Sequence, residues 1–417
     1  MKRPVDPLRH HREGGWDYRG RAIYHFTLPV EGRYPLFGTL EGESAETAFV
    51  RLNAFGRRVC QMLSGLAQFY RGKGYALKVL AQMVMPDHVH LVIQVLEPLP
   101  QSIGAVVRGF KSGCTKVYKE EFYCSGENAA EVHGVPQPGA PQPGAPHPGV
   151  PHPGAAEVHG APHPDVPHPG VPQPGAAEVH SGAPVQFARI FAGRGSIWQP
   201  DKAYYHERIL HAPGQLRRMI DYVKDNPRRL WLKRQNPDLF RLHRETVLCG
   251  LSFTSMGNHF LAQWPDRQLV EMSRSADSTT IDGRLKEVLA AAHNGAVTYT
   301  AAISDGERLI ARAVREQGFP LVVLLADGFP AAGSPHERFY KPGGLYFDAC
   351  SKGLLLLLEP KESAYEDPTI VSAAEDALRR KAEAKHYTYA AVPHSTKRYR
   401  FVALNEMGRL LVRQEDC

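Results

Sequence analysis

The fold of this chain is decided by the stretch Met83–Val95, which reads MVMPDHVHLVIQV. Apolar and β-branched residues surround two histidines, a composition that favours a β-strand. Side chains alternate across a strand, so His88 and His90 share one face while Val89 lies on the other. Two neutral imidazoles side by side on a rigid strand form half of a site for a divalent metal ion. The alternative interpretation is a half-buried strand whose histidines alternate by chance.

The segments around this stretch predict a compact α+β domain. Residues 22–29 and 75–83 read as two further strands, and residues 1–21 as a flexible arm. Residues 45–72 and 103–122 carry apolar side chains at helical spacing, which predicts two amphipathic helices. The order strand, helix, strand, strand, helix is typical of a sheet covered by helices.

Residues 125–184 repeat short units such as VPQPG at 135–139 and VPHPG at 166–170. Such a density of proline and glycine cannot bury a core and predicts a disordered, polyproline-like segment. We interpret it as an insertion, because residues 185–191 read as another short strand of the same domain. The insertion costs only about 1–2 kcal/mol, since loop closure depends weakly on length.

A helix is expected to begin near Pro213, with Leu216, Ile220 and Val223 as its apolar stripe. Residues 204–210 lead into this helix. Tyr222 and Asn226 lie one turn apart on the same face. Pro227 disfavours helix at Asn226 and is expected to close the element. Taken alone, a tyrosine and an asparagine at this spacing form an ordinary surface pair.

Four motifs follow one another along the chain: MPDHVH at 85–90, VVRGFKS at 106–112, IWQ at 197–199 and YVKDNP at 222–227. In this order they resemble the REP-associated and related single-tyrosine HUH transposases, a family of single-strand DNA nucleases, over roughly residues 20–240. The resemblance implies an HUH nuclease domain with an antiparallel sheet and helices, formed by residues 22–124 and 185–244.

The resemblance also implies a metal site and a nucleophile. His88, His90 and the side-chain carbonyl of Asn226 would hold Mg²⁺ or Mn²⁺ as a cofactor that polarises the scissile phosphate. Tyr222 would attack, leaving a 5′-phosphotyrosine and a free 3′-hydroxyl. Because another 3′-hydroxyl can reseal this link, the implied activity is strand transfer in DNA transposition. Tyr204 and Tyr205 are competing candidates for the nucleophile.

The distribution of charge points to an anionic partner. The net charge is +7, and residues 187–247 alone hold thirteen Arg or Lys against six Asp or Glu. With the resemblance, the expected partner is single-stranded or hairpin DNA, bound through phosphate contacts and a base-stacking tryptophan. The candidates are Arg108, Lys111, Trp198, Arg208, Arg217, Arg218, Arg228 and Arg229. Each basic residue alone reads as a solvated surface charge, and only the group favours DNA.

From residue 245 to 417, continuous apolar strands alternate with helices, which predicts a Rossmann-like α/β domain with a mainly parallel sheet. This region is similar to the Rossmann-like domain of DprA/Smf DNA-processing proteins. Its candidate phosphate-binding residues are Ser304, Gly306, Gly343 and Gly344, which follow strands in this interpretation. Ordinary strand–helix turns are the alternative.

Six scattered cysteines, no Cys-x-x-Cys pair and no apolar leader favour a protein of the reducing cytoplasm. The longest apolar run, 354–358, is too short for a bilayer, so no membrane partner is expected. Two other functions stay open: a domesticated hairpin-DNA-binding protein with little catalysis, and a nucleotide-binding enzyme in the second domain that the first domain targets. The long insertion also allows the nucleophile helix to act in a second copy of the chain, as a homodimer.

Overall fold

The computed structural model describes residues 15–123, 195–199, 206–332, 344–384, 386 and 388–413, which fall into two compact units. Unit 1 contains residues up to Glu41 and Phe49–Asn226, and unit 2 contains Gly42–Ala48 and everything from Pro227. The repeat insertion, the expected strand at 185–191, Tyr204, Tyr205, Gly343 and most of the N-terminal arm lie outside the described residues.

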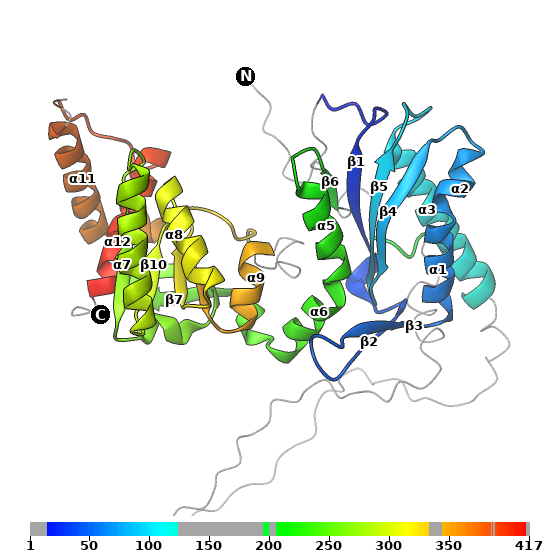
Figure 1. Ribbon diagram of the computed structural model, residues 1–417, viewed down its shortest axis with the longest axis horizontal. Helices are drawn as coiled ribbons and strands as arrows, with labels where there is room; N and C mark the ends of the chain where they lie inside the picture. The colour runs from blue at the N-terminus through cyan, green and yellow to red at the C-terminus, as the bar shows by residue number, and fades with distance from the viewer. Residues whose placement is uncertain are drawn as a thin grey trace, which may run out of the picture. The chain divides into compact units, whose positions relative to one another are not determined.

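Unit 1 is built on an antiparallel sheet, as the sequence predicts. In the described residues its strand order is β4-β5-β1-β6. The strands are β1 (Ile23–Pro29), β4 (Leu77–Val84), β5 (His88–Val95) and β6 (His206–Ile209). Every neighbouring pair in this sheet runs antiparallel. The two-histidine strand therefore lies inside the sheet, between β4 and β1 (Figure 1).

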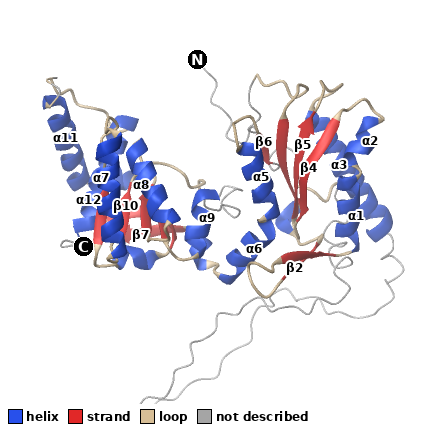
Figure 2. Ribbon diagram, viewed as in Figure 1, coloured by secondary structure: helices blue, strands red, loops and turns tan. Residues whose placement is uncertain are grey.

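The two faces of this sheet differ in chemistry because side chains alternate along each strand. On one face Phe26 of β1 and Leu91 of β5 join the main core. That face is covered by α1 (Ala54–Ser64), α2 (Leu66–Arg71) and α3 (Ile103–Val117), the last followed by the π-helical turn η2 (Tyr118–Tyr123). The other face carries the histidines and is covered by α5 (Gln215–Lys224), as Figure 2 shows.

The helix expected over residues 45–72 is wrong in its first part. Within this range, residues 49–52 form the strand β3 (Phe49–Leu52). It pairs in a hairpin with β2 (Gly38–Glu41), which follows the short turn η1 (Glu31–Arg33). Phe49 is 48% exposed, so it does not belong to an apolar helical face. The helix begins only after Asn53, whose side-chain oxygen accepts a hydrogen bond from the backbone of Gly56 at 2.8 Å.

The region before the nucleophile helix also differs from expectation. Residues 206–209 form the edge strand β6, which was not expected, and the chain then leads into the expected helix. Gly214, with φ of 71°, precedes α5, which ends at Lys224. A second helix, α6 (Asn226–Gln235), begins at once, so Pro227 lies in its first turn, where a missing N–H is harmless. Helix α5 thus ends before Pro227, as expected, but the second helix that begins at Asn226 was not expected.

Unit 2 contains a mainly parallel sheet with helices, as the sequence predicts. The described strand order is β7-β8-β12-β11-β10-β9. The strands are β7 (His243–Leu248), β8 (Leu251–Gly257), β9 (Arg267–Val270), β10 (Val297–Thr300), β11 (Leu321–Leu324) and β12 (Leu355–Pro360). Strands β9 to β12 are parallel, while the β7–β8 hairpin joins β12 antiparallel and was not expected.

Helices cover both faces of this second sheet. Those on one face are α7 (Ser278–His293), α8 (Asp305–Glu316) and α9 (Gly344–Ser351). Those on the other are α10 (Glu362–Tyr365), α11 (Pro368–Glu383) and α12 (Lys397–Arg413), with the turn η5 (His259–Gln263). Along β11, Val323 packs on the first face and Val322 on the second. This alternation explains why the strand reads as a continuous apolar run.

The boundary between the units lies earlier than the expected 244/245. Helix α6 from Pro227 onward and the turn η4 (Asp238–Phe240) belong to unit 2. Phe240 stacks on Phe347 with ring centroids 5.0 Å apart, and the Cys350 thiol donates to the carbonyl of Leu239. These contacts attach the segment to the second core.

None of the described helices combines the length and apolar character that a bilayer crossing requires. Cys60, Cys114 and Cys350 are free thiols.

Candidate active site

The two histidines of β5 lie on the face opposite the main core. In the ladder with β1, His88 pairs with Pro29 and His90 with Thr27. His25, two residues before Thr27, lies on the same face, because residues two apart in a strand share a side. His90 is 1% exposed and His88 8%, so both rings are buried polar groups that need partners.

The two imidazole rings converge on one point. His88 Nε2 and His90 Nε2 are 3.1 Å apart, with the ring planes at 86° to each other. Two nitrogen ligands about 2.1 Å from one ion and at right angles lie about 3.0 Å apart. The observed separation suits two neighbouring ligands on one metal ion, and it equally suits a hydrogen bond between the two rings.

Each ring has an oxygen partner on its other nitrogen. His88 Nδ1 lies 2.6 Å from Asp87 Oδ1, and His90 Nδ1 lies 3.1 Å from Thr27 Oγ1. The carboxylate of Asp87 favours the tautomer of His88 with the proton on Nδ1, so His88 Nε2 carries a lone pair. The hydroxyl of Thr27 can donate or accept, so the proton of a neutral His90 can lie on either ring nitrogen. His25 Nε2 also lies 3.1 Å from His90 Nδ1 and helps to fix that ring.

Asp87 is held as a carboxylate. Burial alone would raise its pKa, but the neighbouring His88, its hydrogen bond and the Arg33 guanidinium outweigh burial and lower the pKa of Asp87 to about 2. Arg33 Nη1 lies 3.4 Å from Asp87 Oδ2. Burial lowers the pKa of Arg33, and the nearby Asp87 and Tyr222 partly offset this effect. The guanidinium of Arg33 thus contacts the same carboxylate that contacts His88.

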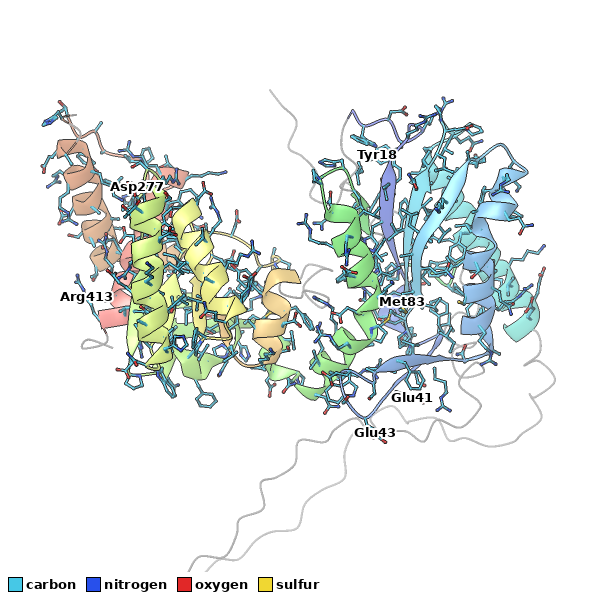
Figure 3. The ribbon with its side chains drawn as sticks, viewed as in Figure 1. Tyr18, Glu41, Glu43, Met83, Asp277 and Arg413 are labelled. Atoms are coloured by element: carbon cyan, nitrogen blue, oxygen red, sulfur yellow. The ribbon has the colours of Figure 1, made fainter. Side chains whose placement is uncertain are left out.

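Helix α5 brings Tyr222 to the histidines. Val223 and Met219 are buried against Val92 of β5, which fixes the helix on the sheet. The ring of Tyr222 lies edge-on to His90, with centroids 5.6 Å apart, and at 6.2 Å from His25. The neighbour of His90 on β4 is Met83, labelled in Figure 3. Strand β5 and helix α5, each predicted from its own sequence pattern, therefore pack against each other in unit 1.

Asn226 is 4% exposed and lies one turn beyond Tyr222. Its Nδ2 donates to the carbonyl of Tyr222 at 2.7 Å and more weakly to that of Val223 at 3.4 Å. Since the amide nitrogen is bound to the helix backbone, only the carbonyl oxygen could serve an ion. Among the described residues no hydrogen bond joins Asn226 to either histidine. Within the same ranges, no group of three His, Cys, Asp or Glu is arranged to hold a metal.

Sequence reasoning missed four residues of this site: His25, Thr27, Arg33 and Asp87. Asp87 is part of the MPDHVH motif, and its position beside His88 was a usable signal. The other three come from β1 and η1, more than fifty residues away, and only the strand register brings them to β5.

Trp198 is not a base-stacking platform. It is 1% exposed, its Nε1 donates to the carbonyl of Lys111 at 3.0 Å, and its ring packs on Phe37 and Phe110. The backbone of Trp198 forms an isolated antiparallel bridge with Val30, the residue after β1. Its role is to hold the IWQ segment in the core of unit 1.

The basic candidates occupy different places. Arg208 on β6 and Arg217 and Arg218 on α5 are exposed, and Arg217 pairs loosely with Asp221 at 3.9 Å. Arg108 and Lys111 lie on α3. Arg228 and Arg229 belong to unit 2, where Arg228 pairs with Asp348 at 2.6 Å and Arg229 lies over the ring of Phe347. These last two residues have structural partners within that unit.

The expected phosphate cradle at Ser304 and Gly306 is wrong, because the chain itself fills it. Ser304 is 2% exposed and caps α8, with its hydroxyl accepting from the backbone of Glu307. The buried Glu307 carboxylate accepts from the backbone of Ile303 at 2.6 Å, Ser304 at 3.2 Å and Met272 at 2.9 Å. A carboxylate thus takes the place that a phosphate would need.

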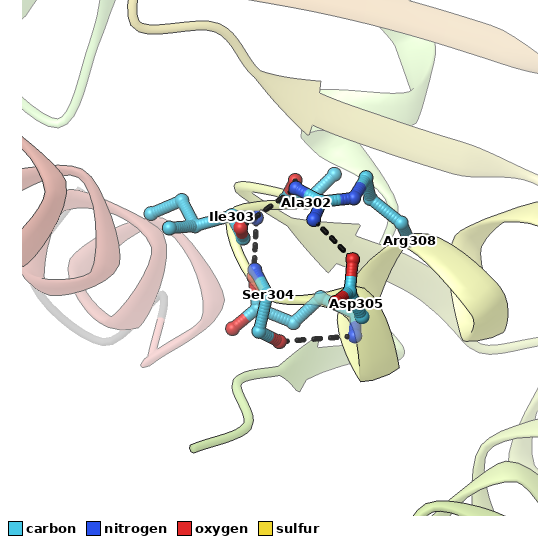
Figure 4. Close-up of polar contacts among 6 residues, drawn as sticks. Ala302, Ile303, Ser304, Asp305 and Arg308 are labelled. Atoms are coloured by element: carbon cyan, nitrogen blue, oxygen red, sulfur yellow. Dashed lines mark hydrogen bonds and ion pairs between the residues drawn. The ribbon is translucent and has the colours of Figure 1, made fainter. Parts of the chain in front are cut away.

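The surroundings of this turn are equally closed. Arg308 reaches back to the carbonyl oxygens of Ala302 and Ile303 and to Asp305 (Figure 4). A side chain at Gly306 would meet the sulfur of Met272 at 3.0 Å, so that backbone is already covered. Gly344 is exposed at the start of α9, and the residue before it, Gly343, lies outside the described residues, so this candidate stays a prediction.

No protein-family model matches the chain. No curated protein matches it either.

Proposed function

We propose that unit 1 is a metal-dependent single-strand DNA endonuclease and strand transferase of the HUH class, with Tyr222 as nucleophile. The observation that supports this best is the convergence of His88 Nε2 and His90 Nε2, 3.1 Å apart, with the Tyr222 ring 5.6 Å from His90. The order of the four sequence motifs supports the reaction class. The geometry supports a cation site with the ring of Tyr222 beside it.

His88 and His90 would hold Mg²⁺ or Mn²⁺, with Asp87 and Thr27 fixing their rings. When bound, the ion would polarise the scissile phosphate and neutralise developing charge. Asn226 is proposed as a further ligand through its carbonyl oxygen, because its amide nitrogen is bound to the backbone of α5.

Tyr222 Oη would form a bond to phosphorus as the bond from phosphorus to the 3′-oxygen breaks. The phenol loses its proton to water, and the departing 3′-oxygen takes one up. The product is a 5′-phosphotyrosine, whose bond energy a second 3′-hydroxyl can use to rejoin DNA.

The test is covalent adduct formation. The full-length protein is incubated with Mn²⁺ or Mg²⁺ and a library of single-stranded hairpin DNAs labelled at either end, and products are run on a denaturing gel. We expect an adduct that keeps the label 3′ of the break and is absent from Tyr222→Phe and His88→Ala. Matched controls are Tyr75→Phe, a core tyrosine on the other face of the sheet, and His211→Ala, an exposed histidine.

Three results would change the proposal. An adduct that survives Tyr222→Phe but is lost in a Tyr204→Phe/Tyr205→Phe variant would move the nucleophile. Tight hairpin binding without any adduct would favour the domesticated DNA-binding protein. An adduct that persists in His88→Ala and needs no metal would reject the metal site.

The alternative of a nucleotide-binding enzyme in unit 2 has lost its main support. Glu307 fills the turn that was to bind phosphate. The other candidate turn, at Gly343 and Gly344, lies at the edge of the described residues, so we do not develop this function further.

A further inference from the structure

Unit 1 contains a cavity of about 530 Å³ between α3 and the segment 195–199. This volume is in the range of ligand-binding clefts. The residues that matter for its chemistry are Arg108, Lys111, Lys116, Lys119, Glu120 and Gln199. We call it the α3 pocket.

The α3 pocket is strongly basic. Four cations line it against one carboxylate, Glu120, which pairs with Lys116 at 3.7 Å. The basic residues recur along one side of α3 and η2, so their charges lie near one another. Like charges gathered in this way repel, and an anion in the pocket would relieve that repulsion.

Lys111 fixes one charge at the wall of the pocket. Its residue is only 8% exposed, and its Nζ donates to the carbonyl of Gln199 at 3.3 Å. Arg108, Lys116 and Lys119 are exposed and can adjust to a ligand. The pocket thus combines the buried ammonium group of Lys111 with three exposed basic side chains.

The pocket is suited to phosphate groups rather than bases. Its aromatic residue, Trp198, is buried with its Nε1 already bonded to the backbone, so it offers no face for stacking. Cationic and hydroxyl side chains, including Ser112, make up the ligand-facing chemistry. Such groups position a nucleic-acid backbone without reading its sequence.

The pocket and the histidine pair lie at the same end of the sheet. The backbone of Gln199 donates to the carbonyl of Pro29 at 3.1 Å, and Pro29 pairs with His88. Two strand spacings of about 4.8 Å place the backbone of Gln199 roughly 10 Å from that of His88. The pocket lies on the α3 face and the histidines on the α5 face, so a strand could reach both by passing around this end of the sheet.

We infer that the α3 pocket binds backbone phosphates of the single-stranded DNA that flanks the bond cleaved at Tyr222. This inference rests on the proposed function, because it takes the cleaved strand to be the occupant. The pocket would serve as a second, sequence-independent anchor a few nucleotides away from the scissile phosphate.

The test is a comparison of DNA binding by Arg108→Ala/Lys119→Ala and by a matched control, Arg71→Ala/Lys78→Ala. The control removes two exposed cations of unit 1 that do not line the pocket. Fluorescence anisotropy of the full-length proteins is measured in EDTA over a range of salt concentrations. The probes are hairpins with single-stranded tails that are absent, short or long on either side.

Loss of two phosphate contacts should reduce the slope of log K against log salt by about 1.4 and weaken binding about 25-fold at about 0.1 M salt. We expect this loss only for probes with a tail on one side, and no change in the control variant. Equal losses in both variants, or a loss that does not depend on the tail, would overturn the inference. Displacement of the probe by a free mononucleotide at low concentration would also overturn it, because the pocket would then be a nucleotide site.

The adduct assay separates this inference from the proposed function. If wild-type protein forms no adduct but the pocket variant still shows the tail-dependent loss, the pocket binds single strands and the nuclease proposal fails. If adducts form and the pocket variant binds every probe like the control, the nuclease proposal stands and the pocket inference fails.

Discussion

Replacing Asp87 by Asn tests how the histidine pair is oriented. The substitution preserves the size of the side chain but removes the negative charge 2.6 Å from His88 Nδ1. An Asn side chain can still accept a hydrogen bond from Nδ1, though more weakly, because charge-assisted hydrogen bonds are about twice as strong as neutral ones. It can also rotate to offer its amide nitrogen, which would favour the wrong tautomer of His88.

The expected magnitude follows from the position of Asp87 behind a metal-ligating histidine. Removing such a partner typically lowers metal affinity 10–100-fold, or about 1.4–2.7 kcal/mol. Arg33→Gln should have a smaller effect, below about tenfold, because it leaves the contact between Asp87 and His88 intact. The affinity for Mn²⁺ should therefore decrease in the order wild type, Arg33→Gln, Asp87→Asn, His88→Ala.

The assay is a titration of each purified full-length variant with Mn²⁺, followed by calorimetry or by water proton relaxation. Asp221→Asn is the control, because Asp221 is an exposed carboxylate of α5 that pairs loosely with Arg217. Thermal denaturation checks that each variant is folded. The reasoning is refuted if Asp87→Asn binds Mn²⁺ as tightly as wild type while His88→Ala does not, or if His88→Ala leaves Mn²⁺ binding unchanged.

Three further predictions concern stability, each measured by chemical denaturation. Because the pKa of Asp87 is lowered from 3.8 to about 2, its carboxylate stabilises unit 1 above pH 3.8, and this contribution is lost as the pH falls through about 2. Asp87→Asn should thus lower the free energy of unfolding by about 2 kcal/mol at neutral pH and by almost nothing near pH 2; an unchanged difference at both would be inconsistent with this. Trp198→Ala should lower the free energy of unfolding by about 3–5 kcal/mol, because it leaves a cavity in the core. If Trp198 were a surface residue that stacks on bases, the same substitution would leave the stability nearly unchanged. Glu307→Ala should lower the free energy of unfolding by roughly 3 kcal/mol, because it leaves buried backbone N–H groups without an acceptor. The exposed control Glu316→Ala should lower it by under about 1 kcal/mol. Equal effects of the two substitutions would refute the role of the cap.

Local patterns predicted the elements that carry the candidate site. The alternation in β5 and the apolar stripe of α5 each depend on neighbours close in sequence, so both were readable. The hairpin of β2 and β3 was not, because Phe49 fits a helical spacing although its side chain is 48% exposed. The helix α6 was missed for a related reason, since a proline is compatible with both the end of one helix and the first turn of the next.

The surroundings of the site depended on contacts between distant segments. His25 and Thr27 reach His90 only because β1 pairs with β5 in one particular register, and sequence periodicity does not determine which strands pair. The burial of Trp198 likewise depends on the packing of the IWQ segment against α3. Ser304 was misread because Ser-x-x-Glu before a helix serves equally as an N-terminal cap and as a turn near phosphate.

The central claim is that Tyr222 becomes covalently linked to DNA at a site formed with His88 and His90. The most direct measurement is mass spectrometry of the protein after reaction with hairpin DNA and Mn²⁺, nuclease trimming of the adduct and proteolysis. The account predicts a nucleotide attached through a 5′-phosphate to the peptide that contains Tyr222, and no such peptide from His88→Ala. A nucleotide on any other residue, or none on a protein that does cleave the hairpin, would contradict it.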